Sequence, residues 1–247
     1  MGGTVLLNAR IFAGAADLTG STNRVELSCT VEEKDATTFK PSGAAAWREV
    51  LGGVASTTVS AAGTWEAGDP GMVDDALWSA LNGRSRLLWT VCPAGASPGD
   101  LAYFASGLVT SYQIGDAAGE VAPWEAEAAG SGLLLRGAVA VSPGARGGDG
   151  EGDGLQLGAL AAGQRLYAGL HVLSAAGTSP SLTVRVESDT DDTWGSPTTR
   201  AAFNPATGAG SQVVSVTGPV TDTWWRVAWE ITGTAPSFVF LVAVGIA

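Results

Sequence analysis

The chain has 247 residues, of which 45% are hydrophobic, and its formal net charge is -11. This composition excludes a disordered protein and supplies enough apolar side chains for one large core or two ordinary ones. The acidic balance lacks the basic footprint of a surface that binds nucleic acid. It is compatible with one nucleic-acid role, that of a conduit through which DNA passes without sticking.

The start of the chain, MGGTVLLNAR, shows no charged segment followed by an apolar stretch, so we expect no secretory signal. No apolar run approaches the roughly 18 residues of a membrane-spanning helix, and we expect no membrane insertion. The two cysteines, Cys29 and Cys92, each lie in an apolar, strand-like context. We interpret both as small buried hydrophobic residues of a protein made in a reducing compartment.

The first 143 residues predict an α+β unit, a sheet with one helix packed across it. Apolar residues alternate with polar ones over residues 22–33, which is typical of a half-buried strand. A short helical turn is expected over residues 44–51, closed by Gly52 and Gly53. Further strands are expected over residues 54–67, 87–93, 102–115, 120–128 and 133–141.

The main helix is predicted over residues 70–82. Asp69 is expected at its N-cap, Pro70 at its first position, and Gly83 at its C-terminal end. The side chains that share its buried stripe are Val73, Leu77 and Leu81.

The composition changes at residues 144–154, which are rich in glycine and aspartate and predict a flexible linker or mobile loop. Domain boundaries are therefore predicted at 1–143, 144–154 and 155–247. The last part predicts an all-β sandwich or jelly roll, because short strand-like segments alternate with turns. Those segments span residues 164–172, 181–188, 212–217, 222–231 and 237–244.

Two acidic clusters suggest calcium binding. The first contains Asp149, Glu151 and Asp153 before Gly154, but Leu160 stands where a calcium loop needs a bidentate glutamate. The second contains Asp189, Asp191 and Asp192. We favour a solvated linker and a turn, respectively, and expect no metal site.

His171 is the single histidine, so neither a histidine metal site nor a conventional catalytic triad can be assembled around it. No nucleophile-elbow, Walker or metalloprotease motif is present. We therefore expect a protein that is not an enzyme and carries no catalytic residues and no cofactor.

Tryptophan is frequent in the last part of the chain. Trp194, Trp224 and Trp225 could form an aromatic platform for cell-surface glycans. The favoured alternative is an ordinary core or subunit contact. Because neighbours on a strand point to opposite faces, one of Trp224 and Trp225 is expected in the core and the other nearer solvent.

A diffuse signature runs through the first 140 residues: T-x-F at 37–39, W-R-x-x-L-G-G at 47–53, G-x-W-E at 63–66, then VDDALWSALNG and LLLRGAV. With the order of the elements, it resembles the major tail tube proteins of long-tailed, siphovirus-type bacteriophages. The resemblance implies a β-sandwich or barrel-like sheet flanked by a helix. It also implies stacked rings, usually of six subunits, whose inner strands join into a channel wall.

The resemblance implies that residues 37–53 form an extended loop that reaches a neighbouring ring. It also implies that residues 155–247 form a decoration domain on the outside of the tube. The implied location is the virion tail, assembled in the host cytoplasm. The implied partners are further copies of the chain, a tape-measure protein, tail terminator or tip proteins, and phage DNA that transits without specific binding.

An acidic lumen would repel the phosphate backbone and let DNA slide. We expect some of the following residues to face it: Asp17, Glu26, Glu32, Glu33, Asp69, Glu120, Glu125 and Glu127. Two alternatives remain: a carbohydrate-binding or adhesion module, and another particle component such as a capsid decoration protein or the tube of an injection device.

Overall fold

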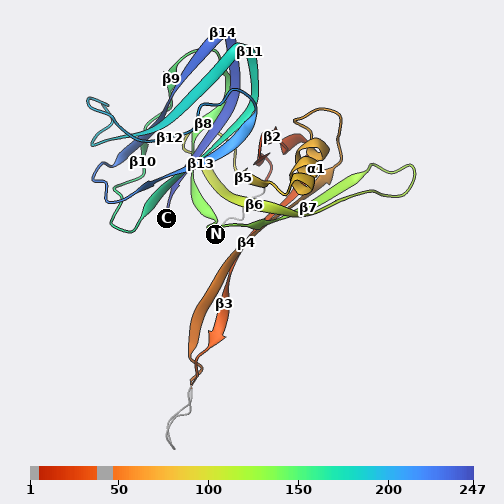
Figure 1. The fold of residues 1–247 in the computed structure, drawn as a ribbon. Helices are drawn as coiled ribbons and strands as arrows, with labels where there is room; N and C mark the ends of the chain where they lie inside the picture. Colours follow the sequence, from red (N-terminus) through yellow and green to blue (C-terminus); the bar gives the residue numbers. More distant parts are fainter. Residues whose placement is uncertain (1–5, 38–46) are drawn as a thin grey trace, which may run out of the picture.

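The structure is a computed structural model that describes residues 6–37 and 47–247. Strands dominate this part of the chain and α1 is the one α-helix in it (Figure 1). This confirms the mainly β fold class that the predicted α+β unit and the predicted all-β part together indicate. No helix within it is long and apolar enough to cross a membrane. The strands are β1 (Arg10–Ala13), β2 (Ala16–Asp17), β3 (Thr22–Asp35), β4 (Val50–Thr64), β5 (Arg86–Cys92), β6 (Leu101–Ile114), β7 (Pro123–Gly130), β8 (Leu135–Arg146), β9 (Gly150–Glu151), β10 (Leu155–Gln156), β11 (Arg165–Asp189), β12 (Thr198–Ala202), β13 (Gly210–Thr217) and β14 (Trp224–Ile246).

The N-terminal strands form an antiparallel sheet in the order β3-β4-β7-β6-β5-β1-β2. Helix α1 (Val73–Gly83) covers one face of this sheet. Between them lies an apolar core, the helix-side core, whose largest fully buried members include Trp89, Trp124 and Leu77. The predicted unit of a sheet and one flanking helix is confirmed.

Helix α1 begins three residues later than the N-cap prediction requires. Its N-cap is Met72, and the backbone carbonyl of Asp69 accepts a hydrogen bond from the Met72 amide at 2.8 Å. Asp69 and Pro70 therefore belong to a turn before the helix, and the prediction that Asp69 is the N-cap was wrong. At the other end the helix includes Gly83 and stops at Arg84, which adopts the left-handed conformation with φ 51°.

The predicted helical turn over residues 44–51 is corrected where the structure describes it. Val50 and Leu51 start strand β4, and Gly52 and Gly53 lie inside that strand. Residues 44–46 lie outside the described residues. The physical reason is the pairing with β3, where Glu33 lies opposite Gly52 and Asp35 opposite Val50, so these residues extend a hairpin.

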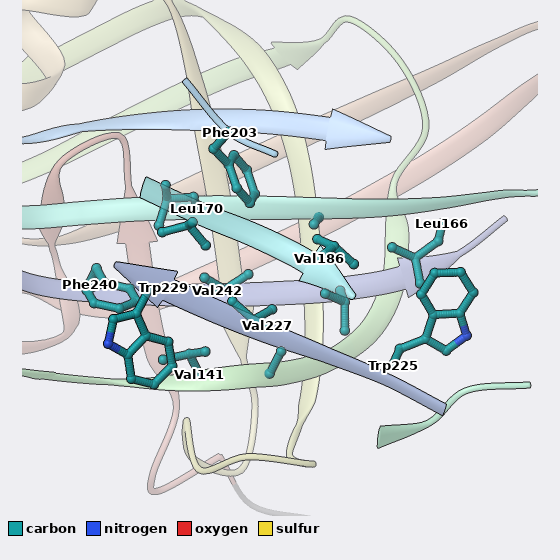
Figure 2. Packing of buried hydrophobic residues seen from close by; sticks show 14 of the residues in the cluster. Val141, Leu166, Leu170, Val186, Phe203, Trp225, Val227, Trp229, Phe240 and Val242 are labelled. Carbon is teal, nitrogen blue, oxygen red and sulfur yellow. The ribbon is translucent and has the colours of Figure 1, made fainter. Parts of the chain in front are cut away.

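In the C-terminal part, β11 and β14 pair along their whole lengths, from Leu166 opposite Ile246 to Asp189 opposite Trp224. Register shifts between Val172 and Ser181 mark a bend in this long ribbon. Its two halves face each other across one apolar core, the C-terminal core, shown in Figure 2. Labelled members of this core include Leu166, Leu170, Val186, Phe203, Trp225, Val227, Trp229, Phe240 and Val242.

The first half of β11, the end of β14 and β8 form a layer that is apolar on both faces, here called the middle layer. Leu170, Phe240 and Val242 face the C-terminal core. Leu241 and Ala243, which alternate with them, face a third core, the junction core, with Phe12, Leu88 and Phe104 of the N-terminal sheet. The run FVFLVAV therefore lacks a polar alternation because both of its faces are buried.

The predicted flexible linker over residues 144–154 is corrected. β8 continues to Arg146, and β9 pairs with β14, with Glu151 opposite Ala228. The glycines permit close approach to indole rings: a Cβ on Gly150 would lie 2.6 Å from Trp229 Cζ2, and one on Gly154 would lie 2.9 Å from Trp194 Cζ2. A glycine-rich composition thus reflects packing on tryptophans here.

β8 connects the two parts of the chain at the predicted domain boundary. It pairs with β6 over Leu135–Ala138 and with β14 over Ala138–Arg146. The division at residues 143 and 155 stays a prediction. A chain ending at residue 143 would lack the strand that pairs with β8 and would uncover the junction core.

Substituting Gly150 or Gly154 by alanine tests the indole contacts. We expect each variant to lower the free energy of unfolding by about 1–3 kcal/mol, because the new methyl group overlaps a tryptophan ring that is packed on its other side. Urea denaturation of the full chain measures this effect. Gly148→Ala is the matched control, because a Cβ there meets nothing within 4 Å, and equal stability of all three variants would contradict the packing role.

Candidate assembly surface

The face of the N-terminal sheet opposite α1 is polar where the C-terminal part does not cover it. Two rows of cross-strand partners run over β3, β4, β7 and β6. The first is Glu26, Ser60, Glu127 and Ser111, and the second is Arg24, Ala62, Glu125 and Gln113. These eight residues are named the open face; seven of them line one groove, and Ala62 lines the adjoining one.

The open face arises from strict alternation along the central strands. In β4, Val59 and Ala61 are buried on the helix side while Ser60 points outward, and in β7 Trp124 and Ala126 are buried while Glu125 points outward. This is the period-2 pattern of a sheet with one buried face.

In β6 the alternation is interrupted by a register shift between Val109 and Ser111. The shift keeps both Val109 and Tyr112 against the helix-side core. The Tyr112 hydroxyl donates a hydrogen bond to Asp74 Oδ1 of α1 at 2.8 Å, and Trp65 Nε1 donates to the same oxygen at 3.1 Å. Burial, with the neighbouring Asp74, raises the pKa of Tyr112, so the hydroxyl stays a donor.

The charge of the open face is negative. It carries three carboxylates, Glu26, Glu125 and Glu127, and one guanidinium, Arg24. Arg24 forms an exposed ion pair with Glu125, an interaction that contributes little to stability in solvent. Within residues 6–37 and 47–247, no ion pair engages Glu26 or Glu127.

The structure brings together three of the eight acidic residues predicted for a lumen, namely Glu26, Glu125 and Glu127. The other five lie elsewhere: Asp17 pairs with Arg10 at 2.6 Å, Glu32 with Lys34, and Glu33 with Arg48 at 3.2 Å, while Asp69 and Glu120 lie in turns. Five members of the open face were not predicted: Arg24, Ser60, Ala62, Ser111 and Gln113. Alternation along β3 and β4 identifies the first three, but the β6 register shift hides Ser111 and Gln113.

The hairpin of β3 and β4 extends away from the body of the molecule (Figure 1). Its distal part, residues 29–37 and 47–56, is named the arm. Large apolar side chains are exposed on it, with Trp47 at 81%, Val54 at 74% and Leu51 at 58% of their full accessible surface. The predicted inter-ring loop, residues 37–53, includes this end of the arm, and residues 38–46 lie outside the described residues.

Strand β3 forms a free edge of the sheet. Within the part of the chain that the structure describes, it pairs only with β4, which leaves the other side of a 14-residue strand without a partner. Such an edge exposes amide and carbonyl groups that can pair with another strand. The open face, the arm and this edge are contiguous, since β3 contributes to all three.

The three tryptophans predicted as a glycan platform do not share an exposed surface. Trp225 is in the C-terminal core at 1% exposure, and its indole NH donates to the Gly158 carbonyl at 2.8 Å. Trp224 is half-buried, which confirms that the two neighbours differ in burial. The Trp194 ring lies 4.5 Å from Arg226 Cζ and contacts Gly154. Trp225 is therefore excluded from a platform, and glycan binding by the other two stays a prediction.

Four of the six carboxylates in the two acidic clusters are engaged by protein groups. Asp149 accepts a hydrogen bond from the Ile231 amide at 2.8 Å, and Glu151 pairs with Arg226 at 2.9 Å. Asp189 and Asp191 each accept from nearby backbone amides in the following turn. Among the described residues no group of three potential metal ligands is found.

The two cysteines differ. Cys92 is fully buried, as predicted, and burial raises the pKa of its thiol to about 12. Cys29 is exposed, so the prediction of burial was wrong for it. In the alternation of β3, Cys29 lies on the same side as Val25 and Leu27, which pack against the helix-side core. The hairpin leaves the body of the molecule at Cys29, so no core residues of the described part of the chain cover its side chain.

No protein-family model matches the chain, and no curated protein matches it. Among solved structures, it is similar to a chain of the "Virion of native gene transfer agent (GTA) particle", with 20% identity over 55% of this chain and 100% of that chain and a TM-score of 0.44. The SPP1 tail tube is 11% identical over 51% of this chain and 75% of that one, with a TM-score of 0.39. The SPP1 Dit protein, described as a hub adsorption apparatus, is 10% identical over 96% and 98%, with a TM-score of 0.32. Each of these TM-scores is below 0.5, and function is therefore inferred from the residues of this chain.

Thiol titration of the full chain in dilute solution tests the two cysteine environments. We expect one thiol, Cys29, to react within the mixing period at pH 8, and the second only on unfolding, because Cys92 is inaccessible and stays protonated. Cys29→Ser should abolish the fast phase. Two fast thiols in the native protein would contradict the burial of Cys92.

Proposed function

We propose that this chain is a structural, non-enzymatic subunit of a phage-type tail tube, in which copies close into stacked rings around an acidic conduit for DNA. The observation that carries this proposal is the juxtaposition on β3 of a free 14-residue edge, an apolar arm and an acidic open face. An isolated protein gains nothing from such an exposed edge and arm, whereas a closed ring uses both as intersubunit contacts.

The open face is the proposed lumen. Glu26 and Glu127 have no cationic partner in the described part of the chain, and with the Arg24 and Glu125 pair they give the face a net negative charge. A negative wall repels phosphates, so DNA can move along it without the counterion release that drives tight binding. The number of subunits in a ring, assumed to be six from the sequence resemblance, stays part of the proposal.

The C-terminal part is proposed to lie on the outside of the tube. The junction core supports a fixed attachment, because Phe12, Leu88 and Phe104 pack against the middle layer. A tape-measure protein and terminator or tip proteins remain proposed partners, and virion tail remains the proposed location. An injection-device tube would use the same surfaces, whereas a free adhesion module loses support because Trp225 is buried.

Electron microscopy of the concentrated full-length protein tests assembly. We expect hollow tubes or stacked rings from the wild-type chain, and dispersed particles from the double variant Trp47→Ser, Val54→Ser, because its arm lacks the apolar contact surface. Trp78→Ser is the matched control: Trp78 is 57% exposed but lies on α1. A wild-type protein that stays monomeric, or an arm variant that assembles normally, would contradict the proposal.

Charge reversal tests the lumen assignment. Tubes of the variant Glu26→Lys, Glu127→Lys should still form and should retain double-stranded DNA in a salt-dependent manner, while virions that carry it should eject DNA more slowly. Glu120→Lys, in the turn between β6 and β7, is the control for surface charge elsewhere. DNA retention that is the same in both variants would show that the open face does not line the conduit.

A further inference from the structure

His171 connects the two parts of the chain inside the junction. It lies on β11 and is fully buried, with Nδ1 2.8 Å from the Gly14 carbonyl and Nε2 2.7 Å from the Thr90 hydroxyl. A carbonyl oxygen can only accept, so Nδ1 carries the proton, and Nε2 accepts from the Thr90 hydroxyl. The neutral imidazole is thereby satisfied on both nitrogens.

This contact is polar within apolar surroundings. Gly14 lies between β1 and β2 and Thr90 lies on β5, so both belong to the N-terminal sheet, whereas His171 belongs to the middle layer. The Phe12 ring centroid is 5.9 Å from the imidazole. The remaining side chains of the junction core are apolar apart from Cys92 and Tyr167.

We propose that the Thr90, His171 and Gly14 contact is an acid-sensitive lock, and that a proton added to His171 opens the junction between the N-terminal sheet and the middle layer. The added proton binds Nε2, because Nδ1 is already protonated. Nε2 then becomes a donor and can no longer accept the hydrogen bond from the Thr90 hydroxyl. It also places a charge in an apolar core, where charge is strongly destabilising. This inference does not depend on the proposed tube function.

The groups around the imidazole do little to stabilise a charge on it. The titratable residues on the surrounding elements include Arg10 on β1, Asp17 on β2, Arg86 and Cys92 on β5, and Tyr167 on β11 itself. Arg86 and Asp75 of α1 line one cavity with Gly14 and Ser211, and the positive charge of Arg86 does not favour a second cation on the imidazole. Asp17 favours the imidazolium, but it is already paired with Arg10 at 2.6 Å. The partners of His171 across β13 and β14 are Ser211 and Leu241, which carry no charge.

Burial lowers the pKa of His171 to about 4, against the opposing effects of the Gly14 hydrogen bond and Asp17. In an opened junction the imidazole would have its ordinary pKa of 6.5. The closed state is therefore fully stable above pH 6.5 and loses stability as the pH falls toward 4, because the open state binds the proton more tightly. The opening equilibrium should rise about 20-fold between pH 7 and pH 5, and about 100-fold by pH 4.

In the described part of the chain, one strand ladder joins the N-terminal sheet to the middle layer, the ladder between β6 and β8. It comprises four residue pairs, from Leu101 opposite Ala138 to Phe104 opposite Leu135. The helix-side core and the C-terminal core do not contain His171. Opening can therefore separate these four pairs and the junction core while both other cores persist.

Hydrogen exchange of the full chain at pH 7 and pH 5, corrected for intrinsic exchange, tests the lock. We expect the amides of residues 101–104 and 135–138 to lose about 20-fold of their protection at pH 5, and those of residues 182–186 in the C-terminal core to keep theirs. The control is His171→Asn, which does not titrate and retains an amide donor near Gly14. Its exchange should not depend on pH. Unchanged protection in the wild type, or the same loss in the control, would overturn the proposal.

NMR titration of the wild-type imidazole decides the question if His171→Asn fails to fold. His171 is the single histidine of the chain, so its ring signals are unambiguous. A titration midpoint near 4, with broadening of the junction signals over the same pH range, is the expected result. A midpoint near 6.5 in the folded protein would overturn the lock.

Discussion

The middle layer constrains the rest of the structure because both of its faces must be buried. Each large apolar side chain removed from water contributes about 1.5–3 kcal/mol, and Phe240 on one face and Leu241 on the other are both fully buried. The C-terminal core and the junction core are thus sides of one sheet segment. The C-terminal part is consequently fixed against the N-terminal sheet, and the polar atoms of His171 must find partners inside the junction.

The same reasoning explains the open face. Burial of Trp124, Ala126 and Ala128 fixes the register of β7 on the helix side, and a slip of one residue would bury Glu125 and Glu127 at a cost of several kcal/mol each. Surface ion pairs such as Arg24 with Glu125 contribute too little to choose the register. The acidic surface proposed for the conduit is therefore positioned by the hydrophobic residues behind it.

Strand alternation next to a core predicts the structure correctly, whereas patterns with two possible physical causes do not. The strand around Val25 and Leu27 follows from alternation alone. Glycine, in contrast, favours both flexible loops and the close approach of the backbone to a ring. The glycines of residues 144–154 therefore predicted a linker, whereas Gly150 and Gly154 pack against Trp229 and Trp194. Cys29 has the correct alternation for burial but no core above it, because the hairpin leaves the body there.

By itself, the sequence determined the mainly β class, the existence of helix α1 and the lack of a basic surface, because periodicity and composition report local preference and total charge. Only the tertiary structure decided which acids share the open face, that Trp225 is core, and that His171 joins two parts of the chain. These outcomes depend on cross-strand register and on contacts between residues far apart in the sequence, such as His171 and Gly14, which are 157 positions apart. Local sequence patterns do not specify such pairings.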